Sequence, residues 1–168
     1  MSEGSSFNAM ATGAYLTDDD GDLLAALRFR WRSEEGGEKG CDLAEFANRF
    51  REWRDAHRDT HFAHLVTLNG TAVGCAWLVV IDRVPGPERF LCRGGMLQSV
   101  YVVPEHRGRG LGTELVGEAL ATARAEGLDY VMVHPSAASF PFYRRLGFAH
   151  SDRVLELRHD DSAEVDSR

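Results

Sequence analysis

A glycine-rich basic turn, placed between an apolar run and an amphipathic segment, constrains this chain most. The run ends at Pro104, and the turn that follows has glycines at alternate positions, Gly108, Gly110 and Gly112. Without Cβ atoms there, backbone N–H groups can close on a ligand. Residues 113–126 are predicted to form a helix, and a helix N-terminus favours anions. Arg107 and Arg109 add positive charge. The turn therefore predicts a pyrophosphate site.

Two common phosphate-binding motifs do not fit this turn. A Walker A loop ends in Gly-Lys-Ser/Thr, and the turn contains no lysine. A dinucleotide fingerprint reads Gly-x-Gly-x-x-Gly within an early βαβ unit, whereas this turn reads Gly-x-Gly-x-Gly without such a unit. The structural alternative is a glycine-rich turn that only caps a core helix.

A second motif lies downstream, after the apolar strand predicted at 130–133. It runs from Ser139 to Phe148 and contains Tyr143 followed by Leu-Gly-Phe. Arg107, Gly110 and Gly112 match the pattern Arg/Gln-x-x-Gly-x-Gly/Ala. The two motifs, in this order and spacing, resemble the acetyl-CoA signature and the closing motif of the GNAT superfamily of N-acetyltransferases. The resemblance is weakest before Leu65.

The resemblance implies an α/β (α+β) fold, a GNAT-like mixed, mainly antiparallel sheet flanked by helices, with a splay between the central strands. It implies acetyl-CoA as the acetyl-donor cosubstrate, with direct attack by a primary amine in a ternary complex. The splay would leave backbone groups unpaired for the cofactor, although the same strand residues also fit an ordinary sheet. The implied cofactor-binding residues are Val100, Tyr101, Val102, Arg107, Gly108, Arg109, Gly110, Leu111, Gly112, Thr113, Ser136 and Ser139.

Two side chains are candidates for the proton transfers. Tyr143 stands where the family keeps a general acid, and a neutral phenol can protonate the leaving thiolate. The alternative is a tyrosine that only packs in the core. His134 is the nearest titratable candidate for the general base, although it can also simply close its strand before Pro135. A water chain that ends on one of four carboxylates is equally compatible: Asp82, Glu88, Glu34 or Glu35.

Acceptor choice in such folds is set by the first two helices and their connecting loop. Trp31, Glu34 and Glu35 fall in this region, and carboxylates beside an aromatic ring can recognise an ammonium group. A solvated loop edge explains the same residues. The acceptor is expected to be a small-molecule or peptide amine. The donor acyl group is taken as acetyl, although a longer one is left open.

Hydrophobic spacing predicts the remaining elements. A first strand falls within residues 9–17, and a helix with an apolar face of Leu23, Leu24, Leu27 and Trp31 follows. A second helix starts at the capping box of Asp42 and Glu45 and is expected to bury Leu43, Phe46, Ala47, Phe50 and Trp53. Asn69-Gly70 predicts a hairpin between 62–68 and 71–81. A loop at 83–93, a strand at 96–103 and a last strand at 153–158 complete the pattern.

Bulk properties narrow the function classes. The chain has 168 residues, 43% hydrophobic and 27% charged, which fits one globular domain. We expect a mobile tail at 1–8, a single N-acetyltransferase domain at 9–160 and an acidic tail at 161–168. A net charge of -7 argues against nucleic-acid binding, and no apolar run is long enough to span a membrane.

The cysteines and histidines indicate no metal site. Cys41, Cys75 and Cys92 form no metal-ligand pair, and reduced thiols in a cytoplasm are the simplest interpretation. His57 and His61 have helical spacing, but a helix end is expected between them. A homodimer is left open. The alternative to an N-acetyltransferase is a degenerate GNAT domain that binds CoA as a sensor or interaction module without turnover.

Overall fold

The computed structural model describes residues 10–12, 18–36 and 40–157. The chain divides into two compact units, one that ends at His134 and one that begins at Pro135. Both predicted tails, 1–8 and 161–168, lie outside the described residues. Among the described helices, none combines the length and the apolar character that a bilayer crossing requires.

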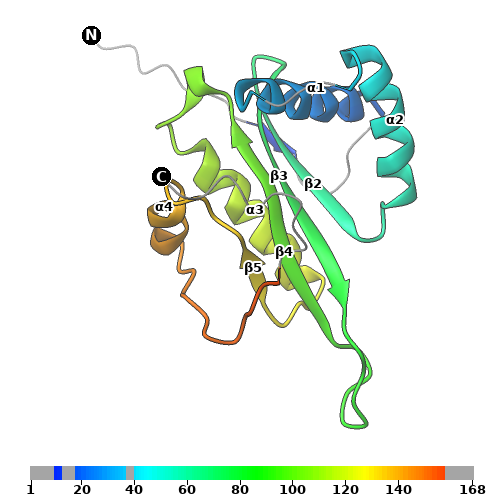
Figure 1. Ribbon diagram of the computed structural model, residues 1–168, viewed down its shortest axis with the longest axis vertical. Coiled ribbons are helices and arrows are strands. Elements are labelled where there is room, and N and C mark those ends of the chain that lie inside the picture. Colours follow the sequence, from blue (N-terminus) through cyan, green and yellow to red (C-terminus); the bar gives the residue numbers. More distant parts are fainter. Residues whose placement is uncertain (1–9, 13–17, 37–39, 158–168) are drawn as a thin grey trace. The chain divides into compact units, whose positions relative to one another are not determined.

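The first unit is built on a five-stranded sheet (Figure 1). Its strands are β1 (Met10–Thr12), β2 (His61–Leu68), β3 (Thr71–Asp82), β4 (Arg93–Val102) and β5 (Val131–Val133). They lie in sequence order, antiparallel from β1 to β4, and β5 joins β4 in parallel. The mixed, mainly antiparallel sheet is confirmed. β1 occupies part of the strand predicted within 9–17, and 13–17 lie outside the described residues.

The tight turn between β2 and β3 is confirmed. Asn69 and Gly70 have φ angles of 51° and 78°, the left-handed conformation that a two-residue hairpin of this type needs. The loop from 83 to 92 joins β3 to β4, and β4 begins at Arg93, three residues before the predicted start. An isolated bridge between Gly86 and Arg89 closes the tip of this loop.

Helices cover both faces of the sheet (Figure 1). They are α1 (Asp18–Glu34), α2 (Leu43–Ala56) and α3 (Leu111–Ala125). α1 buries Leu24 and Leu27. α3 packs on the opposite face, where a Cβ at Gly74 would lie 3.1 Å from Leu115. The absence of that Cβ lets α3 approach β3 closely.

The second helix differs from expectation in what it buries. Its start is as predicted, because the Asp42 side chain accepts a hydrogen bond from the Glu45 N–H at 2.9 Å. Leu43 and Trp53, however, are 43% and 39% exposed, whereas Arg54 is buried. Arg54 occupies the space beside Gly21 of α1, at the crossing of the two helices. The aromatic side of α2 therefore stays partly exposed instead of packing fully into the core.

The second unit contains α4 (Phe140–Arg145) and an irregular segment. The strand predicted at 153–158 is wrong in its described part, because residues 153–157 pair with no described strand. Val154, Leu155 and Leu157 are exposed there. An apolar alternation forms a strand only where a neighbouring edge accepts its backbone hydrogen bonds.

One polar side chain is buried in the sheet without a partner. His64 of β2 is 1% exposed and lies opposite Ala76, on the face that α3 covers. Neither of its ring nitrogens has a hydrogen-bond partner. Burial lowers the pKa of His64 from its ordinary value of 6.5 to about 4. The ring is therefore neutral in the folded protein at physiological pH.

His64 should make the fold sensitive to acid. In the unfolded chain its imidazole takes up a proton near pH 6.5, whereas in the folded protein it does so only near pH 4. The free energy of unfolding therefore falls as the pH drops through this window. We expect the wild type to lose about 2 kcal/mol more than His64→Leu between pH 7 and pH 5. Urea titrations at both pH values measure this difference, and parallel losses in the two proteins would contradict it.

Candidate functional site

The last two strands of the described sheet, β4 and β5, part before β4 ends. β5 pairs with β4 only at Gly95, Met96 and Leu97, and its last residue in the ladder is Val133. β4 continues for five more residues, to Val102, without a described partner on that side. The predicted splay is confirmed, and it leaves an open strand edge that leads directly to the glycine-rich turn.

A bulge bends β4 where the splay begins. Ser99 has a φ of 50°, unusual for a residue other than glycine, and the β3–β4 register shifts between Cys75 and Trp77. The Cys75 thiol donates to the Ser99 carbonyl at 3.7 Å, and Arg28 of α1 donates to the Ser99 hydroxyl at 3.2 Å. The sequence carried no sign of this bulge, because no glycine marks it.

The backbone of β4 beyond the bulge alternates in direction. The Val103 N–H donates to the Val73 carbonyl at 2.9 Å, and Tyr101 lies opposite Cys75 in the ladder. Because successive residues direct their backbone groups to opposite sides, Val100 and Val102 face the open edge. The splay was expected to leave backbone groups unpaired on Val100, Tyr101 and Val102. This is wrong for Tyr101, because its backbone faces β3. Arg107 already uses the Val102 carbonyl, to which its Nε donates at 2.9 Å.

The Tyr101 side chain takes part in a polar cluster instead. Its hydroxyl donates to Glu34 at 2.8 Å, and its ring stacks on Trp31 with 5.7 Å between centroids. The Arg107 guanidinium lies 5.9 Å from the centre of the same ring. Burial, followed by the hydrogen bond to Glu34, raises the pKa of Tyr101 to about 12. This phenol is therefore a structural link between α1 and β4.

The two carboxylates predicted to bind an ammonium group are engaged by arginines. Glu34 accepts from Arg30 at 2.9 Å and lies 3.9 Å from Arg107. Glu35 is paired with Arg32. Arg30 also bridges to Glu105 at 2.6 Å, so α1 is tied to the segment before the turn. These pairings leave Glu34 and Glu35 less suited to bind a cationic substrate.

The turn itself has the geometry of an anion site. Gly108 and Gly110 have φ angles of 74° and 84°, which L side chains rarely adopt. Gly110 is the N-cap of α3 and provides no side-chain cap. Its carbonyl accepts from the Thr113 N–H at 2.9 Å, whereas the first N–H groups of a helix, here those of Leu111 and Gly112, have no intrahelical acceptor. Arg109 and Arg107 are exposed beside them.

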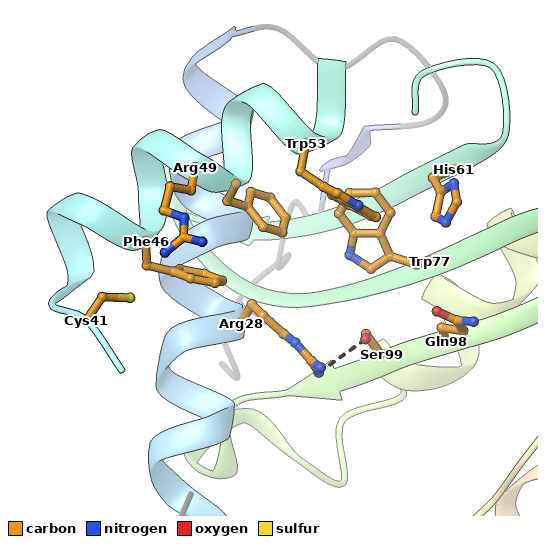
Figure 2. A pocket seen from close by; sticks show the side chains of 10 residues that line it. Arg28, Cys41, Phe46, Arg49, Trp53, His61, Trp77, Gln98 and Ser99 are labelled. Carbon is orange, nitrogen blue, oxygen red and sulfur yellow. Dashed lines mark hydrogen bonds between the residues drawn. The ribbon is translucent and has the colours of Figure 1, made fainter. Parts of the chain in front are cut away.

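A pocket of about 570 Å³ opens beside the bulge (Figure 2). It lies between α1, α2 and the strands β2 to β4. Its walls are Arg28, Cys41, Phe46, Arg49, Phe50, Trp53, His61, Trp77, Gln98 and Ser99. Figure 2 shows Arg28 reaching across to Ser99 beneath the aromatic rings. Of the three predicted acceptor residues, none lines this pocket, although Trp31 packs against Arg28 with 4.8 Å from guanidinium carbon to ring centre.

The base candidates lie at different distances along the sheet from the bulge. His134 is exposed and directly follows β5, at the point where β5 leaves β4. Asp82 is opposite Arg93, at the far end of the β3–β4 ladder, and Glu88 is in the loop beyond it. Sequence reasoning missed His61, which lines the pocket and whose pKa is lowered by burial and then by His57.

His57 and His61 belong to different elements, as predicted, since His57 caps α2 and His61 opens β2. Their rings meet edge to face, with 5.1 Å between centroids. Within the described ranges, no three His, Cys, Asp or Glu side chains are grouped so that they could hold a metal ion.

In the second unit, Tyr143 of α4 is buried and contacts the rings of Phe142 and Phe148, at 5.0 and 5.6 Å between centroids. Burial raises the pKa of Tyr143 above its ordinary value of 10, so the phenol keeps its proton at neutral pH. Ser136 and Ser139 bond each other, with 3.0 Å between their hydroxyl oxygens. They form the turn that leads into α4.

Comparisons with known proteins show the family to which this chain belongs. A family model described as Acetyltransferase (GNAT) family matches residues 23–148. The glucosamine 6-phosphate N-acetyltransferase of Trypanosoma brucei brucei is 33% identical over 118 residues, which cover 70% of this chain and 76% of that protein. An L-methionine sulfoximine/L-methionine sulfone acetyltransferase of Pseudomonas paraeruginosa is 44% identical over 117 residues, which cover 67% of this chain and 65% of that protein.

Solved structures share the fold. A GCN5-related N-acetyltransferase from Ralstonia eutropha superposes with a TM-score of 0.68 at 25% identity, over 90% of this chain and 99% of that one. A protein from Clostridium acetobutylicum, described as a predicted acetyltransferase with acetyl-CoA, has a TM-score of 0.71 at 21% identity, over 90% and 96%. The splayed sheet, the glycine-rich turn and the family match identify this chain as a member of the GNAT acetyltransferase family, an acyltransferase that uses acetyl-CoA.

Proposed function

We propose that this protein transfers the acetyl group of acetyl-CoA to the primary amine of a small molecule, by direct attack in a ternary complex. The observation that carries the proposal is the open edge of β4, which is followed by one short 3-10 helix, Pro104–His106, and then by the turn at the start of α3. The two relatives described above are named for small amine-bearing acceptors, which supports an acceptor of that class.

The turn and the strand edge would hold different parts of the donor. N–H groups of the turn and of the first residues of α3 suit the pyrophosphate, with Arg107 and Arg109 adding charge. Backbone groups of Val100 and Val102, on the open edge, suit the pantetheine arm and the thioester carbonyl. A backbone N–H there would stabilise the negative charge that develops on the carbonyl oxygen.

The reaction also needs two proton transfers. An alkylamine has a pKa of about 10.4, so a base must accept a proton before the nitrogen attacks the thioester carbon. We assign this role to His134, at the end of β5. The C–S bond then breaks, and the CoA sulfur takes a proton from the Tyr143 phenol. No described residue bonds the Tyr143 hydroxyl, which supports its availability.

Gly110 tests the pyrophosphate site. Gly110→Ala adds a Cβ at a φ of 84°, where a left-handed conformation costs roughly 1–2 kcal/mol. We expect the affinity for acetyl-CoA to fall at least tenfold in isothermal titration calorimetry. Gly117→Ala is the matched control, because Gly117 lies within α3 with open space around it. Unchanged affinity in a folded Gly110→Ala protein would remove the turn from the site.

Tyr143 tests the general acid. Tyr143→Phe keeps the ring contacts but removes the proton, and a thiolate is a tolerable leaving group without help because a thiol has a pKa near 8.5. We therefore expect turnover to fall on the order of 100-fold, with little change in acetyl-CoA binding. Tyr130→Phe, at a 42% exposed tyrosine, should keep its rate. Wild-type turnover in Tyr143→Phe would leave water as the proton donor.

The pH profile tests the base. A histidine can accept the amine proton only in its neutral form, so kcat/KM should rise with pH as the catalytic histidine loses its own proton. We expect His134→Ala to flatten that rise, with a smaller loss of turnover than Tyr143→Phe. His61→Ala provides the comparison, since His61 lines the pocket. A rise that persists in His134→Ala but disappears in His61→Ala would transfer the role to His61.

A further inference from the structure

One arginine of the pocket, Arg28, forms no ion pair with a described carboxylate, although Glu35 attracts it from farther away. Arg28 is partly buried, and its guanidinium contacts only the Ser99 hydroxyl, at 3.2 Å, and the Trp31 ring, at 4.8 Å. Its neighbours on α1 differ, because Arg30 is paired with Glu34 and Arg32 with Glu35. Within the part of the chain that the structure describes, no carboxylate forms an ion pair with Arg28. A partly buried charge without a counter-ion favours an anionic ligand.

The rest of the pocket has the same electrostatic character. Among the described residues, the ten that line the pocket include two arginines and no aspartate or glutamate. The second arginine, Arg49, has an exposed side chain and lies 3.6 Å from Glu45, so Glu45 partly neutralises its charge. A wall of this composition repels a polycation, because it offers an ammonium group no carboxylate.

The opposite wall is aromatic. Phe50 packs against Phe46 at 5.6 Å and against Trp77 at 5.9 Å, and Trp53 lies 5.8 Å from Trp77. These rings belong to the partly open side of α2 and to β3, and Figure 2 shows those of Phe46, Trp53 and Trp77 above Arg28. Open aromatic surface is suited to an apolar group, since burial of that group removes apolar area from water.

The position of Arg28 limits how far the anion can be from the amine. Its guanidinium is held at Ser99, one residue before Val100, whose backbone faces the open edge proposed for the thioester. Consider an acceptor whose anionic group is bound to Arg28. Its amine nitrogen reaches the thioester carbonyl carbon only if the anionic group and the amine are a few bonds apart in the acceptor. An α-amino carboxylate meets this condition.

We propose that this pocket binds an α-amino acid with an apolar side chain, its carboxylate on Arg28 and its side chain against the aromatic wall. The inference rests on the proposed function for the transfer step, and it names the acceptor class for that site. Arg28 acts as a specificity residue that holds the acceptor by its carboxylate. A planar guanidinium can accept a carboxylate on two N–H groups at once, which a lysine cannot do.

Matched acceptors test the carboxylate directly. The probes are L-leucine, L-methionine and L-phenylalanine, each with its carboxamide and its decarboxylated amine, together with spermidine and glucosamine 6-phosphate. Thiol release from acetyl-CoA measures transfer, and calorimetry with the CoA-bound protein measures binding. We expect at least one amino acid to exceed its carboxamide and its amine at least tenfold in kcat/KM. Arg28→Gln should abolish this preference through KM.

Arg32→Gln is the control variant, because Arg32 is an ion-paired arginine of the same helix outside the pocket. It should keep the preference for the carboxylate. A preference for spermidine, for glucosamine 6-phosphate or for the uncharged analogues would overturn the inference and leave the proposed transferase standing. If no amine releases thiol, the proposed function fails, and calorimetry alone tests the inference. Binding of an amino acid that requires both its carboxylate and Arg28 would then support the inference. No such binding would overturn it.

Discussion

The parting of β4 from β5 is the feature on which the rest of the site depends. Strands in a sheet normally satisfy each other's backbone groups, so an edge that opens in the middle of a sheet leaves donors and acceptors for another molecule. Here the ladder stops at Leu97 and Val133. The bulge at Ser99 follows within two residues and bends the free part of β4. The open edge then ends at the turn that caps α3 with glycine.

Side-chain contacts hold this open segment in place from the α1 side. Glu34 accepts from the Tyr101 hydroxyl and from Arg30, and it lies near Arg107, which itself bonds the Val102 carbonyl. One carboxylate thus links helix, strand and turn. The individual ion pairs are exposed and each contributes little to stability. Their effect is to fix the directions of neighbouring groups, so α1 influences both the turn proposed for the donor and the pocket proposed for the acceptor.

The same contacts change which residues can meet an acceptor. Glu34 and Glu35 are engaged by arginines, whereas Arg28, one turn or more before them on α1, is left without a carboxylate. The described lining of the pocket contains arginines and no carboxylate, whereas the acceptor residues predicted from the sequence include two glutamates. Its aromatic wall comes from α2, whose apolar face packs only in part because α2 meets α1 at Gly21 and Arg54 rather than lying flat on the sheet.

The sequence by itself determined the parts that depend on local chemistry. The Asn69-Gly70 turn, the Asp42 cap, the amphipathic faces of α1 and α3 and the glycine conformation at Gly110 each follow from one or a few neighbouring residues. The motifs also identified the family and the splay, through resemblance.

Only the tertiary structure decided the bulge at Ser99, the direction of the Tyr101 backbone, the partners of Glu34 and the unpaired charge of Arg28. These features are set by groups distant in sequence, since a salt bridge or a strand register has no local signature. The strand predicted at 153–158 failed for the same reason, because its pattern could not supply the edge with which a strand must pair.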